Sequence, residues 1–572
     1  MRVLFVYPNL YTQMGFNHGL ASLSAVLKQA GHETRLLNLN ENLPPVPSDE
    51  DVWRAVVEWG PGVVGFSCLT QQYRAAVELA HFLRRRAREA RRELPPLVVG
   101  GVHPTMVPEE TMAEGVWDHV GVGECEDALR ELVRRIESGD RPTDVANFLS
   151  WKDGVRPALA EHAPGAPVAP TAPAAKITSE HWIHNKVGEF PNLETLPIPD
   201  YELFDVQRIT DQKHGWFGLL SSRGCPYRCT YCLNHKIVDR YHDELGRAVP
   251  DLGFFRYRPP HKLVEEIEWV LARYTGIGTF IFDDDLFTQN STHAIAVADA
   301  YRKAKIEVPF VVNSHVKRLD PKVAKALGEA GCKILKLGIE SGSPRVRKEV
   351  LQRFMSDTDI LKTVEAAEQH GLHTSGFLMV GLPYETHEER WETVDLLAKS
   401  GIGRFRTSLF FPFPGTESHR LALNGGYIRP EQELKLTDFT ESSCLDFGAE
   451  ENLFIAKLAA CMPWFVNSRM DRFRDAPAAK RYQPWVAKVL AMDAEEWARF
   501  EPTVRDVDRE LAREASLAAE LHYSIRYNAF MGVRSDFYLA EEQGVEWYTA
   551  AAKPIPERLR ALALAAAADE VC

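Results

Sequence analysis

The segment Ser222-Arg-Gly-Cys-Pro-Tyr-Arg-Cys-Thr-Tyr-Cys-Leu-Asn234 carries Cys225, Cys229 and Cys232 in the spacing C-x3-C-x2-C, directly after the apolar run Trp216 to Leu220. Three thiolates at this spacing can hold three corners of an iron–sulfur cube, which normally takes four. The fourth iron then lacks a protein ligand and can bind and activate another molecule. The spacing therefore predicts a catalytic [4Fe-4S] cluster and not an electron-transfer centre.

A zinc site, a disulfide pair and three unrelated thiols are the alternatives for this motif. Structural zinc needs four closed ligands, usually as two separated pairs, and the chain has no second C-x2-C pair. His235 is the candidate for a fourth zinc ligand. Arg-Gly before the first cysteine, Pro226 after it and Tyr231 before the last one suit a cluster loop, so the cluster is favoured.

The motif resembles the signature of the radical S-adenosylmethionine (AdoMet) superfamily. The resemblance implies that the open iron chelates the amino and carboxylate groups of S-adenosyl-L-methionine. It also implies that one electron from the cluster cleaves the sulfonium to a 5′-deoxyadenosyl radical, with an external one-electron donor such as flavodoxin or ferredoxin as partner. In that family the aromatic residue before the last cysteine, here Tyr231, lies against the adenine.

Length and charge limit the class of protein. A chain of 572 residues exceeds a single core and should divide into about three or four domains. The net charge of −13 argues against nonspecific binding to nucleic acid or to an anionic membrane. No apolar stretch approaches about 18 residues, and Met1 to Val6 reads as a strand and not as a signal peptide. We expect a cytoplasmic protein with no membrane span, whose six other cysteines are thiols and not disulfide partners.

The first 140 residues alternate strand and helix. Strands are predicted at Arg2–Tyr7, His32–Leu39, Val63–Ser67, Leu97–Val99 and His119–Gly121, with helices at Gly19–Gln29, Asp51–Trp59 and Tyr73–Arg92. This alternation predicts a Rossmann-like, doubly wound parallel sheet, in which ligands lie beyond the carboxyl ends of the strands. The loops Pro8–Thr12, Ser67–Gln71, Gly100–Thr105 and Gly123–Glu126 should therefore surround one site.

These loops resemble the cobalamin-binding domain that precedes the barrel in one large radical AdoMet subgroup. Glycines would let the backbone approach a large planar ligand, and small hydroxyls would bond its amides and phosphate tail. The resemblance places these residues at cobalamin: Asn9, Ser67, Leu69, Thr70, Gly100, Gly101, His103, Gly123 and Glu124. The chain lacks the D-x-H-x-x-G motif that supplies a histidine to cobalt. A turn histidine is the favoured interpretation of His103, and a domain that keeps this shape without cobalamin is the alternative.

From Trp216 to about Phe413 the alternation resumes. Strands are predicted at Phe217–Ser221, Thr279–Asp283, Val308–Asn313, Lys333–Gly338, His373–Val380 and Arg404–Phe411. Six strand–helix repeats match the partial (β/α)6 TIM-like barrel of the superfamily, whose functional residues lie at the carboxyl ends of the strands.

Strand-end motifs in this region resemble the AdoMet-binding segments of the family. They imply contacts from Asp284 and Asp285 to the amino group, from Glu340 or Ser341 to the ribose or carboxylate, and from the segment around Leu382 to adenine. Asn313 ends another strand. His315 stands where relatives often have arginine, which puts any transferred role for it in doubt. A divalent-cation site at the three consecutive aspartates, starting at Asp283, is the alternative.

We expect four segments: a cobalamin-binding domain at 1–145, an Ala/Pro-rich linker and connector at 146–200, the radical AdoMet barrel at 201–418, and a mainly helical, aromatic-rich substrate or capping domain at 419–572. In the last segment His522, Arg526 and Arg534 fit a helical spacing as polar candidates.

The resemblance implies a C-methyltransferase that acts on a small-molecule or natural-product substrate. One AdoMet would methylate cob(I)alamin to methylcobalamin. A second would yield the 5′-deoxyadenosyl radical, which abstracts hydrogen from an unactivated carbon that then takes the methyl group. The alternatives are a radical rearrangement, cyclisation or C–C coupling without methyl transfer, and, in another class, a noncatalytic cobalamin or cluster carrier. The complete set of barrel motifs argues against the carrier.

Overall fold

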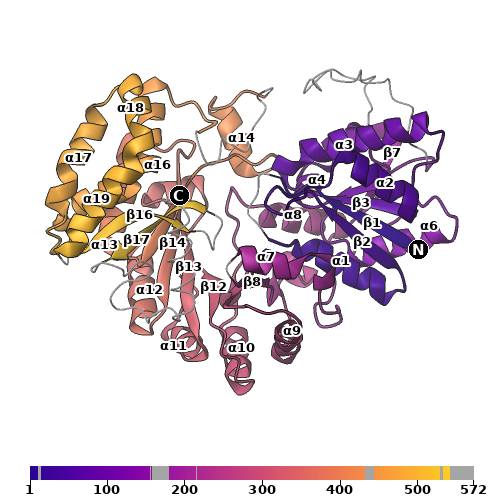
Figure 1. The fold of residues 1–572 in the computed structure, drawn as a ribbon, viewed down its shortest axis with the longest axis horizontal. Helices are drawn as coiled ribbons and strands as arrows, with labels where there is room; N and C mark the ends of the chain where they lie inside the picture. The colour runs from indigo at the N-terminus through magenta and orange to yellow at the C-terminus, as the bar shows by residue number, and fades with distance from the viewer. Residues whose placement is uncertain are drawn as a thin grey trace.

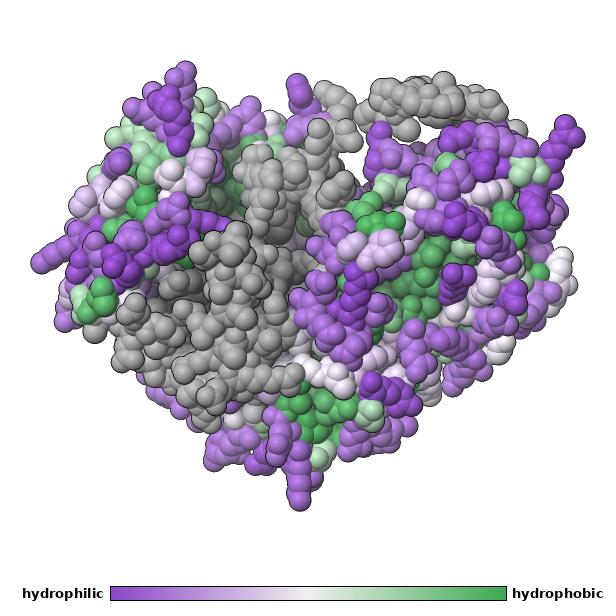
Figure 2. Space-filling view, viewed as in Figure 1, coloured by the Kyte–Doolittle hydropathy of each residue, from purple (hydrophilic) through white to green (hydrophobic). Residues whose placement is uncertain are grey.

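The computed structural model describes residues 1–10, 15–154, 156, 179–213, 215–430, 432, 443–518, 520–528 and 533–540. Two large sheets organise these residues (Figure 1). The amino-terminal sheet with its helices forms one side of the molecule, the barrel lies in the centre, and the carboxyl-terminal helices cover the far side. Hydrophilic side chains dominate the visible face (Figure 2). In the described part of the chain, no helix is long and apolar enough to cross a membrane.

The amino-terminal sheet has the predicted doubly wound core. Its strand order is β2-β1-β3-β4-β5-β6-β7, and the first five strands are parallel. The strands are β1 (Arg2–Tyr7), β2 (Glu33–Asn38), β3 (Val63–Ser67), β4 (Leu97–Gly100), β5 (His119–Gly121), β6 (Phe148–Trp151) and β7 (Trp182–His184). The helices are α1 (His18–Gln29), α2 (Asp49–Trp59), α3 (Thr70–Glu89), α4 (Val102–Met106), α5 (Pro108–Ala113) and α6 (Glu126–Glu137). Five residues of β1 are buried, as in a strand covered on both faces.

The sheet continues beyond residue 145, into the segment predicted as linker. Strands β6 and β7 pair antiparallel with β5 and with each other. Trp151 and Trp182 are buried and pack edge to face at 6.0 Å, and the Trp151 indole donates to the Trp117 carbonyl at 2.8 Å. The linker prediction came from the Ala-Pro run at 163–170, which lies outside the described residues. The Ala- and Pro-rich composition of this segment gave no indication of the short strands β6 and β7 on either side of the run.

The central sheet has the order β16-β17-β15-β14-β13-β12-β11-β8, and its last six strands are parallel. They are β8 (Trp216–Leu219), β11 (Thr279–Phe282), β12 (Phe310–Ser314), β13 (Cys332–Glu340), β14 (His373–Val380) and β15 (Arg404–Leu409). The helices that follow are α8 (Asn234–Leu245), α9 (Pro260–Arg273), α10 (Ser291–Lys303), α11 (Pro321–Ala330), α12 (Asp357–Gln369), α13 (His387–Ser400) and α14 (Glu417–Asn424). The predicted partial (β/α)6 barrel is confirmed.

The carboxyl-terminal region is helical through α16 (Ala449–Arg469), α17 (Ala479–Ala491), α18 (Ala494–Phe500) and α19 (Val504–Leu517). The helical spacing predicted around His522 is wrong. Residues His522–Asn528 and Val533–Ala540 form the antiparallel strands β16 and β17, and β17 pairs with β15. This hairpin covers the edge of β15, which would otherwise expose unpaired backbone groups. The side chains of Arg526 and Arg534 lie outside the described ones.

Candidate functional site

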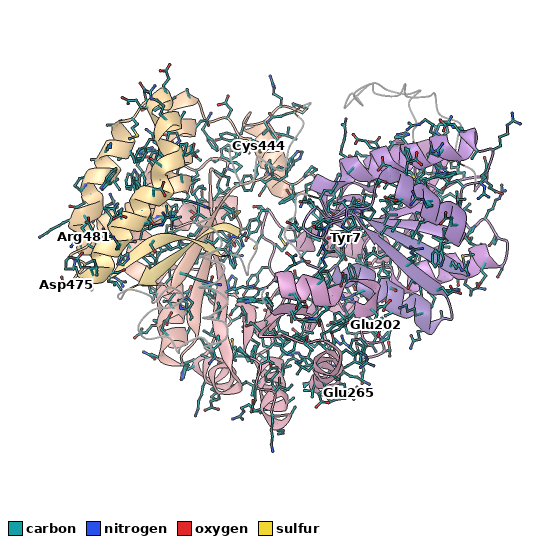
Figure 3. All side chains as sticks on the ribbon, in the orientation of Figure 1. Tyr7, Glu202, Glu265, Cys444, Asp475 and Arg481 are labelled. Atoms are coloured by element: carbon teal, nitrogen blue, oxygen red, sulfur yellow. The ribbon has the colours of Figure 1, made fainter. Side chains whose placement is uncertain are left out.

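The carboxyl ends of the two parallel sheets face each other across a shared cavity of about 430 Å³. Tyr7, labelled in Figure 3, marks the end of β1 on this side. Six of the nine residues predicted at cobalamin line the cavity: Ser67, Leu69, Gly100, Gly101, Gly123 and Glu124. The barrel contributes Leu220, Ser222, Arg223, Asp283 and Asp285. Three of the four predicted loops thus meet at this cavity. No described residue of the fourth, Pro8–Thr12, lines it, and residues 11–12 lie outside the described residues.

The other three predicted residues, Asn9, Thr70 and His103, lie outside the lining of this cavity. Asn9 is buried and accepts a hydrogen bond from the Gln72 side chain at 3.3 Å. His103 stacks on Tyr73 at 4.0 Å, its Nδ1 lies 3.4 Å from Thr70 Oγ1, and burial lowers its pKa to about 4. A neutral, packed histidine is what the turn interpretation predicted. Cobalamin contacts from these three residues remain predictions.

The glycines of the cavity wall are present for different structural reasons. Gly101 has a φ of +101°, and a Cβ there would lie 2.7 Å from the Cys68 carbonyl oxygen, so the loop itself requires glycine. Gly123 has a φ of +74°, and a Cβ there would lie 2.6 Å from the Tyr241 hydroxyl oxygen. Gly100 is different, because a Cβ there would meet no atom within 4 Å. The protein itself does not require glycine at this position, but the absence of a side chain leaves room for a ligand.

The deep part of the cavity is apolar. Phe5, Leu23, Leu129 and Phe148 line it between α1, α6 and the sheet, and a Cβ on Gly65 would lie 3.2 Å from the Phe5 ring. An apolar depth with a few polar groups at its rim is the usual form of a cofactor site. These residues therefore fit a large cofactor whose bulky part inserts into the amino-terminal sheet.

Glu124 joins the cavity wall to the barrel by ion pairs that the sequence did not predict. Arg223 Nη1 donates to Glu124 Oε2 at 2.5 Å and to Glu126 Oε1 at 2.7 Å. Arg256 Nη1 donates to Glu124 Oε2 at 3.1 Å, and its Nη2 donates to Oε1. Burial alone would raise the pKa of Glu124, but the two guanidinium groups lower it. Arg223 precedes the cluster loop by two residues, so this carboxylate fixes the loop to the other unit.

The cluster loop is held at its middle and at its start. Thr230 Oγ1 donates to the Val350 carbonyl at 2.8 Å, and the Thr230 carbonyl accepts from the Ser418 amide at 2.9 Å. Gly224 has a φ of +98°, and a Cβ there would lie 2.4 Å from the Phe254 carbonyl oxygen. Tyr227 stacks on His315 at 4.0 Å. Burial lowers the pKa of His315 to about 3, so it packs as a neutral ring.

The three predicted cluster ligands lie near one another, since each of the Cys225 and Cys232 thiols interacts electrostatically with Cys229. Within the described residues, no three His, Cys, Asp or Glu side chains are placed to share one metal ion. The zinc alternative and the three-aspartate cation site therefore have no ligand set there. A cubane differs, because each cysteine binds a different iron.

The consecutive aspartates divide into separate roles. Asp284 is fully buried and accepts hydrogen bonds from the Ser221 amide at 2.7 Å, the Ser221 hydroxyl at 2.6 Å and the Ser222 hydroxyl at 2.5 Å. Burial raises its pKa to about 6, against the effect of these bonds. Asn313 donates to the Asp284 carbonyl at 2.8 Å. The Asp284 carboxylate therefore bonds Ser221 and Ser222, and the AdoMet contact predicted for this residue remains a prediction.

The Asp285 side chain faces the cavity, unlike that of Asp284. It lines the cavity, accepts a hydrogen bond from the Gly224 amide at 3.3 Å and interacts electrostatically with Cys225 and Cys232. A carboxylate beside the cluster ligands and open to the cavity is placed to accept from an ammonium group. The amine contact predicted from the motif remains a prediction for Asp285.

Tyr231 and Glu340 meet beside the cluster loop, as the two motifs predicted separately. The Tyr231 hydroxyl donates to Glu340 Oε1 at 3.1 Å. Glu340 is buried and has a φ of +69°, a conformation that costs a non-glycine residue on the order of 1–3 kcal/mol. Burial raises its pKa, while Arg353 opposes that shift. The strained backbone turns this carboxylate toward the cluster side of the barrel.

Arg353 is the residue of this group that sequence reasoning missed. It is buried, and its Nη1 donates to Cys229 Sγ at 3.3 Å and to the Tyr231 hydroxyl at 3.0 Å, while Nη2 donates to the Gly338 carbonyl at 2.5 Å. One guanidinium thus contacts a predicted cluster ligand and the predicted adenine-side tyrosine. It lies in no motif that was used, so no signal in the sequence singled it out.

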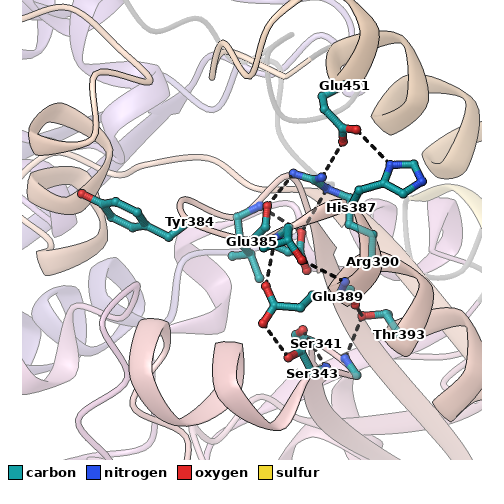
Figure 4. A network of polar contacts seen from close by, with 12 residues as sticks. Ser341, Ser343, Tyr384, Glu385, His387, Glu389, Arg390, Thr393 and Glu451 are labelled. Carbon is teal, nitrogen blue, oxygen red and sulfur yellow. Dashed lines mark hydrogen bonds and ion pairs between the residues drawn. The ribbon is translucent and has the colours of Figure 1, made fainter.

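Ser341, labelled in Figure 4, and Leu382 lie in supporting positions. Ser341 is fully buried, and its hydroxyl accepts from the Ser343 amide at 3.2 Å. Ser343 donates to Glu389 at 3.0 Å, which fixes the end of β13 to α13. Leu382 is buried in a cluster of apolar side chains against which Tyr231 packs. Direct AdoMet contacts from Ser341 and Leu382 remain predictions.

Comparison with known proteins agrees with this division of the site. Residues 219–397 match the model of the radical SAM superfamily, and residues 11–133 match the model of the B12 binding domain. An uncharacterized methyltransferase of Pyrococcus horikoshii is 26% identical over 71% of this chain and 78% of its own length. The cytidylyl-2-hydroxyethylphosphonate methyltransferase of Streptomyces wedmorensis is 24% identical over 79% of this chain and 86% of its own.

Solved structures share the fold. The radical S-adenosylmethionine methyltransferase TsrM from Kitasatospora setae superposes with a TM-score of 0.55 at 18% identity, over 75% of this chain and 77% of its own. The cobalamin-dependent S-adenosylmethionine radical enzyme OxsB, with aqua-cobalamin and S-adenosylmethionine bound, gives 0.60 at 14% identity, over 88% and 75%.

The fold and the cluster loop define a radical SAM enzyme. Its amino-terminal B12-binding domain places it among the cobalamin-dependent members, whose cofactors are a [4Fe-4S] cluster, S-adenosylmethionine and cobalamin. The expected family is thereby confirmed. Among relatives, the named activities include methyl transfers and the anaerobic cyclisation of magnesium-protoporphyrin IX monomethyl ester.

Proposed function

We propose that this enzyme is a C-methyltransferase that places a methyl group on an unactivated carbon of a small-molecule or natural-product substrate. The observation that carries the proposal is the shared cavity. Loops of the B12-binding domain form one wall, and Asp285, beside Cys225 and Cys232, belongs to the other. Methyl transfer to a radical needs the methyl donor and the radical source to face one space.

When bound, the cluster with AdoMet supplies a 5′-deoxyadenosyl radical, and cobalamin supplies the methyl group. The residues of this chain position these groups. Gly100 gives a large ring access to the sheet edge, Asp285 accepts from the AdoMet ammonium, and Glu340 bonds its ribose. The ion pairs of Glu124 with Arg223 and Arg256 hold the two walls at a fixed separation, which keeps water out of the seam.

The relatives support methyl transfer over the other outcomes. Both relatives described above that share most of their length with this chain are methyltransferases. A non-methylating rearrangement, cyclisation or C–C coupling is the second candidate, because a magnesium-protoporphyrin IX monomethyl ester cyclase of Rubrivivax gelatinosus is 23% identical over 72% of the chain.

Product stoichiometry distinguishes the two. The full chain is purified anaerobically, reconstituted with iron, sulfide and hydroxocobalamin, and incubated with AdoMet and a chemical one-electron reductant. Methyl transfer predicts S-adenosylhomocysteine and 5′-deoxyadenosine together, in equal amounts once a substrate is present. Formation of 5′-deoxyadenosine without S-adenosylhomocysteine would replace our proposal by the non-methylating one. The Cys229→Ala variant is the control for both products.

The remaining assignments are part of the same proposal. We propose functional boundaries at residues 1–145, 146–200, 201–418 and 419–572, with β6 and β7 extending the first fold unit to His184. An external donor such as flavodoxin or ferredoxin supplies electrons. Eight free cysteines among the described residues, three of them at the cluster, favour a reducing, cytoplasmic location.

A further inference from the structure

Lys336 is a buried lysine inside the barrel that none of the cofactor assignments uses. On β13 its neighbours Leu335, Leu337 and Ile339 belong to the core between strands and helices. Side chains alternate along a strand, so Lys336 points to the opposite face, the barrel interior. Its side chain is 7% exposed. A lysine so deeply buried is rare unless its charge has a partner.

The described residues provide no direct contact partner for Lys336. Among them, its ammonium forms no ion pair within 4.0 Å and no hydrogen bond. Its electrostatic neighbours are Asp283, Arg404, Lys213 and Arg406, which are three cations and one carboxylate. Burial and these cations lower the pKa of Lys336 to about 8, and Asp283 only partly opposes them.

Asp283 is shared with the other unit. His18, at the start of α1, places Nε2 at 3.4 Å from Asp283 Oδ2, and Lys213 also interacts with this carboxylate. Both His18 and Asp283 line the cofactor cavity. Lys336 is therefore an electrostatic neighbour of a carboxylate that lines this cavity, although Lys336 is not itself among the lining residues.

The position along the strand relates Lys336 to the cluster. In register, Lys336 lies between Asn313 on β12 and Ser375 on β14. It is two residues, about 7 Å, before Gly338, whose carbonyl binds Arg353 beside Cys229. A molecule that reaches from the radical source toward the barrel interior would bring its far end to Lys336.

A purely structural lysine is the alternative. Burying an ammonium without a counter-charge costs several kcal/mol, and an apolar residue of the same length would avoid that cost. Asp283 offsets this cost only in part. The unpaired charge is understandable if a bound anion completes the site.

We propose that Lys336 binds an anionic group of the substrate, a phosphoryl or carboxylate oxyanion, inside the barrel. This inference rests on the proposed function, because it assigns the substrate of that reaction to the barrel interior beside the cavity. The substrate class is then an acid or phosphate ester whose reacting carbon lies toward the cavity and whose anion lies toward β13.

The test measures binding of anions to the full chain loaded with cluster and cobalamin. Saturating AdoMet is present without reductant, so that the AdoMet site is filled and no turnover occurs. Methylphosphonate and acetate are titrated calorimetrically, with trimethyl phosphate and acetamide as uncharged counterparts. Lys336→Met removes the charge at nearly constant length, Lys336→Arg restores it, and Lys322→Met removes an exposed lysine of α11 as the matched control.

We expect saturable binding of at least one anion in the range of about 10 mM or tighter, and no binding of the uncharged counterparts. Lys336→Met should weaken it at least about tenfold, while Lys336→Arg retains most of it and Lys322→Met leaves it unchanged. Preference for methylphosphonate identifies a phosphoryl substrate, and preference for acetate identifies a carboxylate.

Two results of the anion titrations would overturn the inference: no saturable anion binding in the parent protein, or equal binding in Lys336→Met. AdoMet affinity, read from the electron paramagnetic resonance signal of the reduced cluster, is measured in parallel. A tenfold loss there in Lys336→Met would assign the lysine to AdoMet and also refute the proposal. Anion binding is measured separately from product stoichiometry, so failure of this inference and failure of the proposed methyl transfer are distinguishable.

Discussion

The two walls of the cavity are built in opposite ways, although each is the carboxyl edge of a parallel sheet. The amino-terminal wall is formed largely by glycines and apolar side chains, and it makes room by leaving a side chain out at Gly100. The barrel wall carries the charged side chains Arg223, Asp283 and Asp285. One wall selects a ligand by shape and the other by charge, so substitutions on the two sides should fail in different ways.

The largest effect is expected at the charged wall, from loss of a cluster ligand. Replacing Cys225, Cys229 or Cys232 with Ala should remove the cluster and abolish AdoMet cleavage, because a cubane with only two protein ligands is not retained. Iron content and 5′-deoxyadenosine are the measurements. Cys332→Ala, a buried cysteine on β13, is the control and should keep about four iron per chain. Cleavage by any of the three variants would contradict the assignment.

The second-largest effect is expected at the ion pairs between the two walls. Glu124→Gln leaves Arg256 without its carboxylate partner and Arg223 with Glu126 alone, and breaking such a largely buried pair costs about 3 kcal/mol or more. Chemical denaturation should show this loss near neutral pH. Because the folded-state pKa of Glu124 lies below 4.5, its contribution is present above pH 4.5 and is lost as the pH falls through the folded-state value. Equal stability of parent and variant at pH 7 would contradict this.

The next prediction concerns the amino-terminal wall, at Gly100. Gly100→Leu should lower cobalamin affinity by more than about tenfold, because the side chain enters empty space that the ligand needs. Bound cobalt per chain is the measurement, and an intact cluster spectrum is the control for folding. Retained cobalt would place the cofactor elsewhere in the cavity.

A smaller and more specific effect is expected at Arg353. Arg353→Met removes a positive donor from Cys229 and should shift the cluster potential to more negative values, since hydrogen bonds to the sulfurs tune it. A redox titration followed by electron paramagnetic resonance measures the shift. Arg353→Lys should restore part of it. An unchanged potential in the Met variant would make Arg353 a packing residue.

The smallest effect is expected at the solvent edge of the seam. His184 on β7 lies 3.2 Å from Glu109 and 3.4 Å from Glu244 on α8, and these carboxylates raise its pKa to about 9. Its raised pKa contributes stability below pH 6.5 that is lost as the pH rises through about 9. Because the group is partly exposed, His184→Gln should cost no more than about 1 kcal/mol at pH 7. A loss as large as that of Glu124→Gln would contradict the difference between buried and exposed pairs.

The local sequence pattern was sufficient to predict the parallel strands of both sheets. All six barrel strands and the five parallel strands of the first sheet lie within a few residues of their predicted ranges, because buried parallel strands are short apolar runs separated by helices. The site loops followed, since a parallel sheet brings the carboxyl ends of its strands together.

Long-range pairing was beyond the sequence. The partners of Glu124 lie 99 and 132 residues away, and nothing near Arg353 marks its contact with Cys229. Strands β16 and β17 were predicted as helix, because spacing alone does not show that β15 has an edge to cover. Asp284 matched a motif, yet its carboxylate bonds Ser221 and Ser222, which only the folded chain reveals.

The pairing of Glu124 with Arg223 has a consequence for how such proteins can be divided. Gly224 and Cys225 follow directly after Arg223, so the amino-terminal unit holds the entrance of the metal-binding loop of its neighbour. The units are therefore not interchangeable modules joined by a tether. A barrel expressed alone, or fused to a foreign B12-binding unit without an acidic residue at the position of Glu124, would keep the barrel's own contacts at Thr230 and Tyr227 but lose the restraint that Glu124 places on Arg223.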